Sequence, residues 1–299
     1  MEAWIFLSVM AAAFQTLRFM LQKQLSMGAL SAGGATFARF AYSAPFAALA
    51  AAVCIVWYGN GLPALGNRFW PFVLSGGLAQ ILATWCVVAI FAERNFAVGI
   101  TFKKTEVVLT ALIGLIVLGD RVSLPGILAI IVGLMGVLVL SDPPAGGRGW
   151  RRFANRAAGL GLASGFCFAI SAVAYRGATL EVASDAPFLR AILSVTAVTA
   201  SQTLAMALWL SRREPGELAR VWAARGKAVW MGLASMGGSI GWFTAFALQN
   251  AAYVFAVGQI EVIFSILVSV LFFRETISRR EYLGIALLSL SIVALVLLG

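Results

Sequence analysis

Ten stretches of this chain are apolar over most of the ~20 residues that a membrane-spanning helix needs. Because most linkers between them are brief, neighbouring helices should form antiparallel hairpins. The fifth and tenth stretches are the short ones. The sequence therefore predicts an all-α integral membrane protein with ten transmembrane helices. The stretches are residues 3–21, 37–57, 69–91, 97–118, 124–140, 157–176, 187–210, 228–248, 252–273 and 282–298.

The composition supports a membrane environment. Hydrophobic residues make up 61% of the 299 residues and charged residues only 11%, whereas soluble domains contain about 45–50% apolar and about 25% charged residues. A soluble protein of this size could not bury so much apolar surface. The excess must face lipid, so membrane lipid is an expected partner.

The net charge of +10 does not indicate a nucleic-acid partner here. The basic residues lie largely between the apolar stretches, as expected of loops held on the cytoplasmic side of a membrane. The chain has no histidine and its three cysteines are isolated, which excludes cysteine–histidine metal sites. It also lacks a P-loop motif, so ATP is not the direct energy source. We expect no nucleic acid, metal or cofactor.

The two halves of the chain resemble each other at an offset of 155 residues. The segment from Phe91 lies without gaps over the segment from Phe246. Lipid-facing helices look alike by chance, but matched polar residues at one offset are harder to explain that way. The matches are Phe91/Phe246, Asn95/Asn250, Ala97/Ala252, Glu106/Glu261 and Ser123/Ser278, with the acidic pair Asp120/Glu275.

Each repeat would contain five helices, and an odd number inverts the second repeat relative to the first. Inverted repeats place a binding site near the midplane, where the two halves rock against each other. We therefore predict two inverted five-helix repeats around a central cavity. The first repeat would span residues 1–142 and the second 157–299, with a basic linker at 143–156.

Glu106 and Glu261 are the clearest candidates for chemistry. A charge inside a spanning helix costs about 2.5–3.5 kcal/mol on insertion scales. Each acid lies nine residues into its apolar stretch, which places it roughly 13 Å into a ~30 Å hydrocarbon core. We expect a carboxylate that faces the cavity and binds a cation or amine, or exchanges a proton. A structural acid bonded to a neighbouring helix is the alternative.

The polar residues near these acids are further candidates for substrate binding. Lys103 is three residues before Glu106, on the same helical face, and could pair with it. Lys104 lies elsewhere around the helix and is expected to extend toward the membrane interface. Either lysine could instead bind a substrate carboxylate. Gln80, on the third helix, is another polar residue at mid-span.

The repeat carries motifs of a known family. Two apolar helices end in a small acidic turn, Leu118-Gly119-Asp120-Arg121 and Phe273-Arg274-Glu275-Thr276, and each leads into a short glycine-bearing helix. This pattern resembles the EamA-type branch of the drug/metabolite transporter superfamily over nearly the whole chain. The resemblance implies a ten-helix exporter of amino acids, other metabolites or toxic organic compounds. Within that branch the chain is most similar to the amino-acid exporters, including the aromatic ones.

Four aromatic residues complete the candidate set. Phe14 and Phe168, on the first helix of each half, occupy the region where the resemblance implies an aromatic side chain. Trp85 and Trp242, on the third and eighth helices, could line an apolar pocket. Lipid contact or core packing is the alternative for each.

The orientation in the membrane can be argued in two ways. Three arginines lie on the side of the termini and even-numbered linkers, and the opposite side is much richer in Lys and Arg. The positive-inside rule then places both termini outside, whereas the family resemblance implies termini inside. GxxxG spacing at Gly161–Gly165 and Gly237–Gly241 permits close helix packing, and we expect a monomer rather than a dimer.

The sequence thus favours a secondary transporter that exports small organic metabolites by alternating access, with amino acids as the first substrate class. We expect a multi-pass protein of a bacterial-type inner (plasma) membrane. Export of drugs or toxic organic cations is the alternative substrate class. An integral membrane enzyme is the alternative of another kind, but no acid–base cluster stands out. A channel would need a ring or filter of polar groups.

Overall fold

The computed structural model describes residues 2–28, 30–58, 61–90, 102–140, 156–264, 267 and 279–298. Within these ranges the regular elements are helices, and the single β-bridge joins Leu65 to Val182. The helices are α1 (Ala3–Ser26), α2 (Ala32–Tyr58), α3 (Phe69–Ile90), α5 (Glu106–Leu118), α6 (Leu124–Leu140), α7 (Arg156–Leu180), α8 (Pro187–Arg213), α9 (Glu217–Ala223), α10 (Arg225–Leu248), α11 (Ala251–Gly258) and α13 (Arg279–Leu298).

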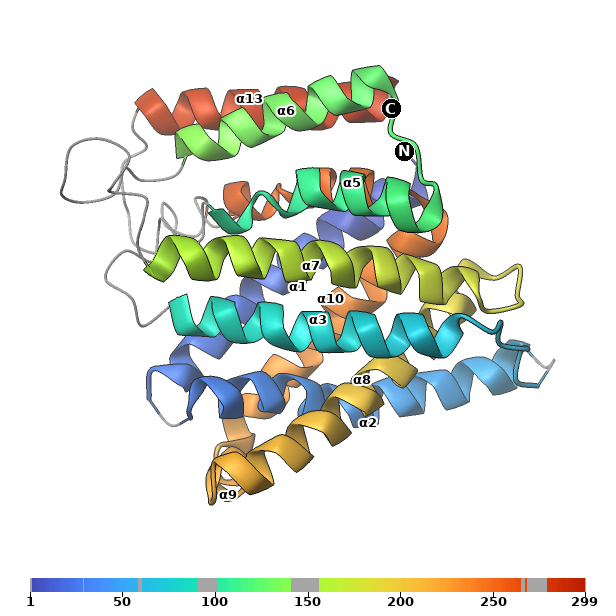
Figure 1. Ribbon diagram of the computed structural model, residues 1–299, viewed down its shortest axis with the longest axis vertical. Coiled ribbons are helices and arrows are strands. Elements are labelled where there is room, and N and C mark those ends of the chain that lie inside the picture. The colour runs from blue at the N-terminus through green and yellow to red at the C-terminus, as the bar shows by residue number, and fades with distance from the viewer. Residues whose placement is uncertain are drawn as a thin grey trace.

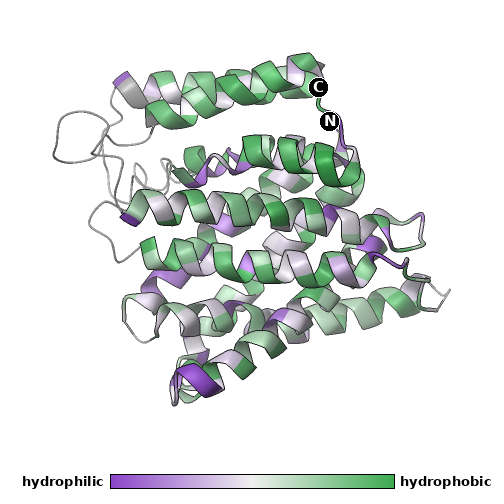
Figure 2. Ribbon diagram, viewed as in Figure 1, coloured by the Kyte–Doolittle hydropathy of each residue, from purple (hydrophilic) through white to green (hydrophobic). Residues whose placement is uncertain are grey.

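Six helices are long and apolar enough to cross a membrane. They are α1, α2, α3, α7, α8 and α10, and the chain also has shorter apolar helices. Large apolar side chains such as Val56, Trp57 and Ile116 are more than four-fifths exposed, as expected of surfaces that face lipid. Figure 2 shows apolar residues over most of α6 and α13. The predicted all-helical, multi-pass membrane protein is confirmed at this level.

The helices α3, α5, α6, α7 and α13 run roughly side by side, α1 and α10 cross them obliquely, and both termini lie at the same edge of the molecule (Figure 1). The most extensive helix contacts join α3 to α7, α1 to α10, α2 to α8 and α6 to α13. Each of these pairs joins a helix of the first half to a helix of the second. The core is therefore built between the halves rather than within either one.

Most predicted spans correspond to single helices, but their ends differ. The helices α1, α2, α7, α8 and α10 each extend beyond the predicted stretch. Hydropathy marks where apolar residues stop, whereas the backbone hydrogen bonds continue through polar residues. The segment between the predicted stretches 187–210 and 228–248 contains the short helix α9, which the sequence analysis did not predict.

The prediction of continuous fourth and ninth helices is wrong. Lys104 and Thr105 form a turn before α5 begins at Glu106, and Gln259 and Ile260 form a turn after α11 ends, before the chain is helical again from Glu261 to Phe264. The turns replace helical bonds by tighter ones, as Thr105 N–H donates to the Phe102 carbonyl at 3.2 Å and Ile260 N–H to the Val257 carbonyl at 3.1 Å. The two turns lie 155 residues apart.

A glycine on α7 makes room for the first turn. A β-carbon on Gly165 would lie 2.7 Å from the carbonyl oxygen of Lys103, which is closer than side-chain carbons approach backbone. The predicted GxxxG spacing is therefore used at Gly165 for close packing inside this chain. On α10, a β-carbon at Gly237 would meet the ring of Phe14 at 2.9 Å.

Candidate functional site

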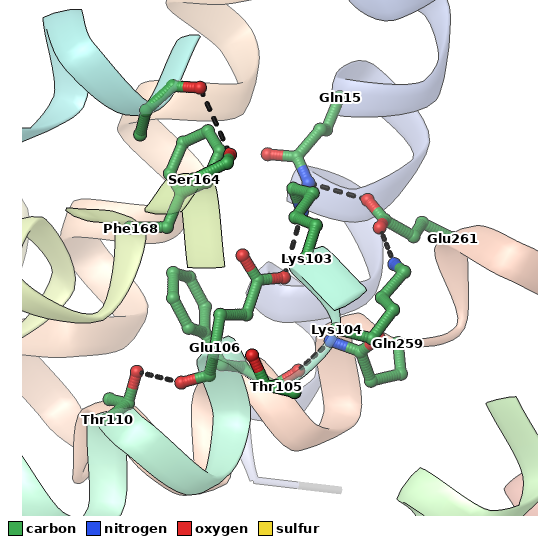
Figure 3. A network of polar contacts seen from close by, with 12 residues as sticks. Gln15, Lys103, Lys104, Thr105, Glu106, Thr110, Ser164, Phe168, Gln259 and Glu261 are labelled. Atoms are coloured by element: carbon green, nitrogen blue, oxygen red, sulfur yellow. Dashed lines mark hydrogen bonds and ion pairs between the residues drawn. The ribbon is translucent and has the colours of Figure 1, made fainter. Parts of the chain in front are cut away.

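Two buried lysine–glutamate pairs lie at the interrupted spans (Figure 3). Lys103 Nζ is 2.8 Å from Glu106 Oε1, and Lys104 pairs across the molecule with Glu261. All four residues are buried. Because of the turn in the fourth span, Lys103 pairs with an acid of the first half and Lys104 pairs with an acid of the second half.

The expected extension of Lys104 toward the membrane interface is wrong. Its side chain is 3% exposed and ion-paired with Glu261. The turn at Lys104 and Thr105 breaks the helical spacing on which that expectation relied, and it places Lys104 against the second half. The proposed pairing of Lys103 with Glu106 is present.

Each ion pair has further polar and aromatic support. The Gln15 side chain on α1 donates from Nε2 to Glu261 Oε2 at 2.5 Å. Lys103 Nζ lies 4.9 Å from the centre of the Phe168 ring, within the range of a cation–π contact. Acids and lysines are thus held in fixed positions rather than left free.

A cavity adjoins this cluster between the two halves. It is lined by residues of α1, α2, α3, α7, α10 and α11, and it shares Gln15, Phe168, Trp242 and Phe255 with the space around the acid–lysine pairs. We call the two adjoining spaces the central chamber. The cavity volume is about 30 Å³, enough for about two water molecules. A larger ligand would require the helices to separate.

Two buried arginines face the same cavity. Arg18 on α1 donates from Nη1 to Gln22 Oε1 at 2.8 Å, and its guanidinium lies 4.0 Å from the centre of the Phe19 ring. Arg39 on α2 donates from Nε to Ser235 Oγ at 3.1 Å and from Nη1 to Thr84 Oγ1 at 2.7 Å. These hydrogen-bond partners are neutral, so they do not compensate either charge.

Gln80 belongs to a second polar cluster at the cavity wall. Its Oε1 accepts hydrogen bonds from the Tyr175 hydroxyl at 2.8 Å and from Gln202 Nε2 at 2.9 Å. Gln202 also donates to the backbone carbonyl of Gly77 at 3.1 Å. Gln80 is therefore fixed between α7 and α8, with its side chain at the cavity.

Aromatic rings form much of the remaining wall. Trp242 stacks on Phe246, with ring centres 6.1 Å apart, and Phe255 meets Trp242 edge-on at 5.5 Å. Tyr175 stacks on Phe243 at 4.4 Å. The chamber thus combines charged groups with flat apolar surfaces beside them.

The structure separates the sequence-predicted candidates into two groups. Those that line the chamber are Glu106, Glu261, Gln80, Lys103, Phe168 and Trp242, whereas Lys104 lines a neighbouring pocket and reaches the site through its ion pair with Glu261. Trp85 packs edge-on against Trp209 at 4.7 Å, and Phe14 packs over Gly237, so the alternative of core packing describes both. Neither is among the residues that line the described cavities.

Sequence reasoning missed Arg18 and Arg39. The first predicted span ended at residue 21 and the second began at residue 37, so both arginines looked like flanking residues. The helices are longer, and Arg18 lies eight residues before the end of α1 at Ser26. An arginine inside a spanning helix signals function, but that signal depends on knowing the true helix ends.

Comparison with known proteins supports a transporter. Residues 155–297 match the EamA-like transporter family, so the second half of the chain carries an EamA-like domain, and this supports the drug/metabolite transporter superfamily. A solved structure described only as "Crystal structure of protein" superposes with a TM-score of 0.68 at 17% identity, over 97% of this chain and 99% of that one. This likeness concerns the fold alone. No curated protein matches the chain.

Proposed function

We propose that this protein is a secondary transporter that exports small organic metabolites across a bacterial-type inner (plasma) membrane by alternating access. Amino acids, aromatic ones included, are the substrate class that we favour. The observation that carries this proposal is the central chamber, which is bordered by charged side chains at two interrupted spans, one from each half. Discontinuous helices of this kind form midplane substrate sites in many transporters.

We further propose ten spans arranged as two inverted repeats, residues 1–142 and 157–299, joined by the linker 143–156. The helix contacts support this arrangement. Exchanging α1 with α7, α2 with α8, α3 with α10 and α6 with α13 turns the contact of α3 with α7 into that of α10 with α1, and leaves α2–α8 and α6–α13 unchanged. A pseudo-twofold relation would produce this exchange.

Both halves contribute to substrate binding in this proposal. Phe168 on α7 and Trp242 on α10 would contact the apolar part of the substrate, and Gln80 its polar groups. Glu106 and Glu261 would bind an ammonium group or carry a proton when their lysines are displaced. We favour Glu106 for this role.

The competing functions have less support. The matched family consists of transporters, which argues against an enzyme. Organic cations are disfavoured because each chamber acid already has a lysine partner, and a cationic substrate would have to displace that lysine inside the membrane.

The test is transport into proteoliposomes. A panel of labelled amino acids should show saturable flux with wild-type protein, measured with and without a pH gradient. Glu106→Gln should lower the flux, and Lys103→Met/Glu106→Gln, which removes both charges, should stay folded and remain slow. Product formation without net flux would instead indicate an enzyme.

A further inference from the structure

The charged residues of the central chamber do not balance. Lys103 pairs with Glu106, and Lys104 pairs with Glu261. Within the described residues, these are the two acids that line the chamber, and each has a lysine as its ion-pair partner.

Two positive charges remain on the cavity wall, those of Arg18 and Arg39. Arg18 is 2% exposed and Arg39 is 5% exposed, and both residues line the same cavity. Their hydrogen-bond partners in the described chain are Gln22, Ser235 and Thr84, all neutral. Like charges across one small cavity repel each other more strongly than in water.

We propose that Arg18 and Arg39 together bind the carboxylate of the substrate, so that the chamber takes organic anions and zwitterions and excludes organic cations. This inference rests on the proposed function for transport, but the binding step can be measured by itself. A guanidinium group suits the task because its N–H groups form a planar fork that matches a carboxylate.

The donors needed for such binding remain available. Arg18 uses Nη1, and Arg39 uses Nε and Nη1, for the hydrogen bonds to described residues. The Nη2 groups make no hydrogen bond to a described residue. They can therefore donate to a ligand in the cavity.

A purely structural role explains less. Arg39 connects α3 and α10 through two hydroxyl groups, and an uncharged amide could make similar bonds without bringing a charge into the membrane. A buried cation is costly unless an anion accompanies it. A bound carboxylate would provide that anion, and the neighbouring rings of Tyr175, Trp242 and Phe246 would contact the rest of the ligand.

The ligand class can be tested with three probes that share one phenyl group. Phenylalanine has a carboxylate and an ammonium group, 3-phenylpropionate lacks the ammonium group, and 2-phenylethylamine lacks the carboxylate. Binding to purified protein in nanodiscs would be measured by calorimetry. We expect phenylalanine and 3-phenylpropionate to bind and 2-phenylethylamine not to bind.

Variants connect the binding to the two arginines. Arg18→Gln and Arg39→Gln should each weaken the binding of 3-phenylpropionate about tenfold or more, since hydrogen bonds to charged groups contribute that much. The matched control is Arg225→Gln, because Arg225 is exposed at the start of α10, where it contacts the backbone carbonyl and the ring of Trp222, and it does not line the chamber. Unchanged melting temperatures without ligand would show that the variants fold.

The inference is overturned if 2-phenylethylamine binds as well as 3-phenylpropionate, if both arginine variants bind like wild type, or if none of the probes binds. Transport distinguishes this failure from failure of the proposed function. Saturable export of 2-phenylethylamine would support the transport function and contradict the anion site. Carboxylate binding without any flux would support the anion site and contradict the transport function.

Discussion

The lysine–glutamate pairs show how this chain keeps four charges inside a membrane. Each charge would be costly alone, but each has an opposite charge within contact distance. Breaking a buried pair by removing one partner is strongly destabilising, whereas removing both partners is often tolerated. The pairs therefore make a prediction that does not depend on the substrate.

Lys104→Met and Glu261→Gln should each lower the free energy of unfolding by about 3–5 kcal/mol, because each leaves one buried charge without its partner. The double variant should lose less than the more damaged single variant. Thermal unfolding in detergent would measure all three. If the double variant loses the sum of the single effects, the pair is not coupled.

Among the buried charged residues, the sequence analysis identified the acids but not the arginines. Glu106 and Glu261 stood out because each interrupts a long apolar stretch and because they match at the 155-residue offset. Arg18 and Arg39 did not, since each lies near the edge of an apolar stretch and has no matched charge in the other half. The cross-half pairing of Lys104 depends on a backbone turn that composition does not reveal.

The interruptions of the fourth and ninth predicted helices are the main structural feature that hydropathy did not predict. The stretch around Lys104 and Thr105 contains no proline, and the predicted stretch 252–273 runs through the turn at Gln259 and Ile260. The helix α5 ends visibly in the sequence, by contrast, at Gly119 with φ of +71°, a left-handed conformation that favours glycine. Ends with special backbone geometry are predictable, and breaks stabilised by packing are not.

The close approach of α7 to the first break should be sensitive to one methyl group. Gly165→Ala would place its β-carbon 2.7 Å from the Lys103 carbonyl oxygen, so we expect a loss of about 1–3 kcal/mol and slower transport. Gly159→Ala, on the same helix, meets no atom within 4 Å and should be neutral or slightly stabilising. Melting temperatures and flux would be compared.

Equal stability of Gly165→Ala and Gly159→Ala would show that the helix and the turn do not pack as described. A loss of flux at unchanged stability would instead mean that Gly165 matters for movement rather than for folding.

In the whole molecule, polar contacts connect the two halves at the end that carries the termini. Arg176 on α7 binds Asp120 after α5, with 2.6 Å between Arg176 Nε and Asp120 Oδ2, and donates from Nη1 to the carbonyls of Phe246 and Gln249. The Tyr253 hydroxyl donates to Ser123 Oγ at 3.1 Å. We infer that this end is closed in the described conformation.

Arg176→Gln should open that end more often, because it removes the ion pair with Asp120. A single cysteine at Ser239, on the chamber wall, in a chain without Cys54, Cys86 and Cys167, should then react faster with an impermeant maleimide added on that side. Arg68→Gln, which changes an exposed arginine at the same end, should not alter the rate. Equal rates in both variants would contradict the closed end.

Orientation in the membrane is a separate prediction. Loop charge places both termini outside, so a reporter fused after Gly299 should lie outside and one inserted within residues 148–156 should lie inside. These positions are outside the described residues. The reverse pattern would mean that the orientation implied by the family resemblance holds.

The central claim is that substrate crosses through the chamber between the halves. Counterflow of labelled phenylalanine in proteoliposomes tests it most directly, with Ser239→Trp to fill the chamber and Ser75→Trp as the control on an exposed face of α3. The account predicts saturable counterflow for wild type and Ser75→Trp, and none for a folded Ser239→Trp. Equal counterflow in all three proteins would contradict it.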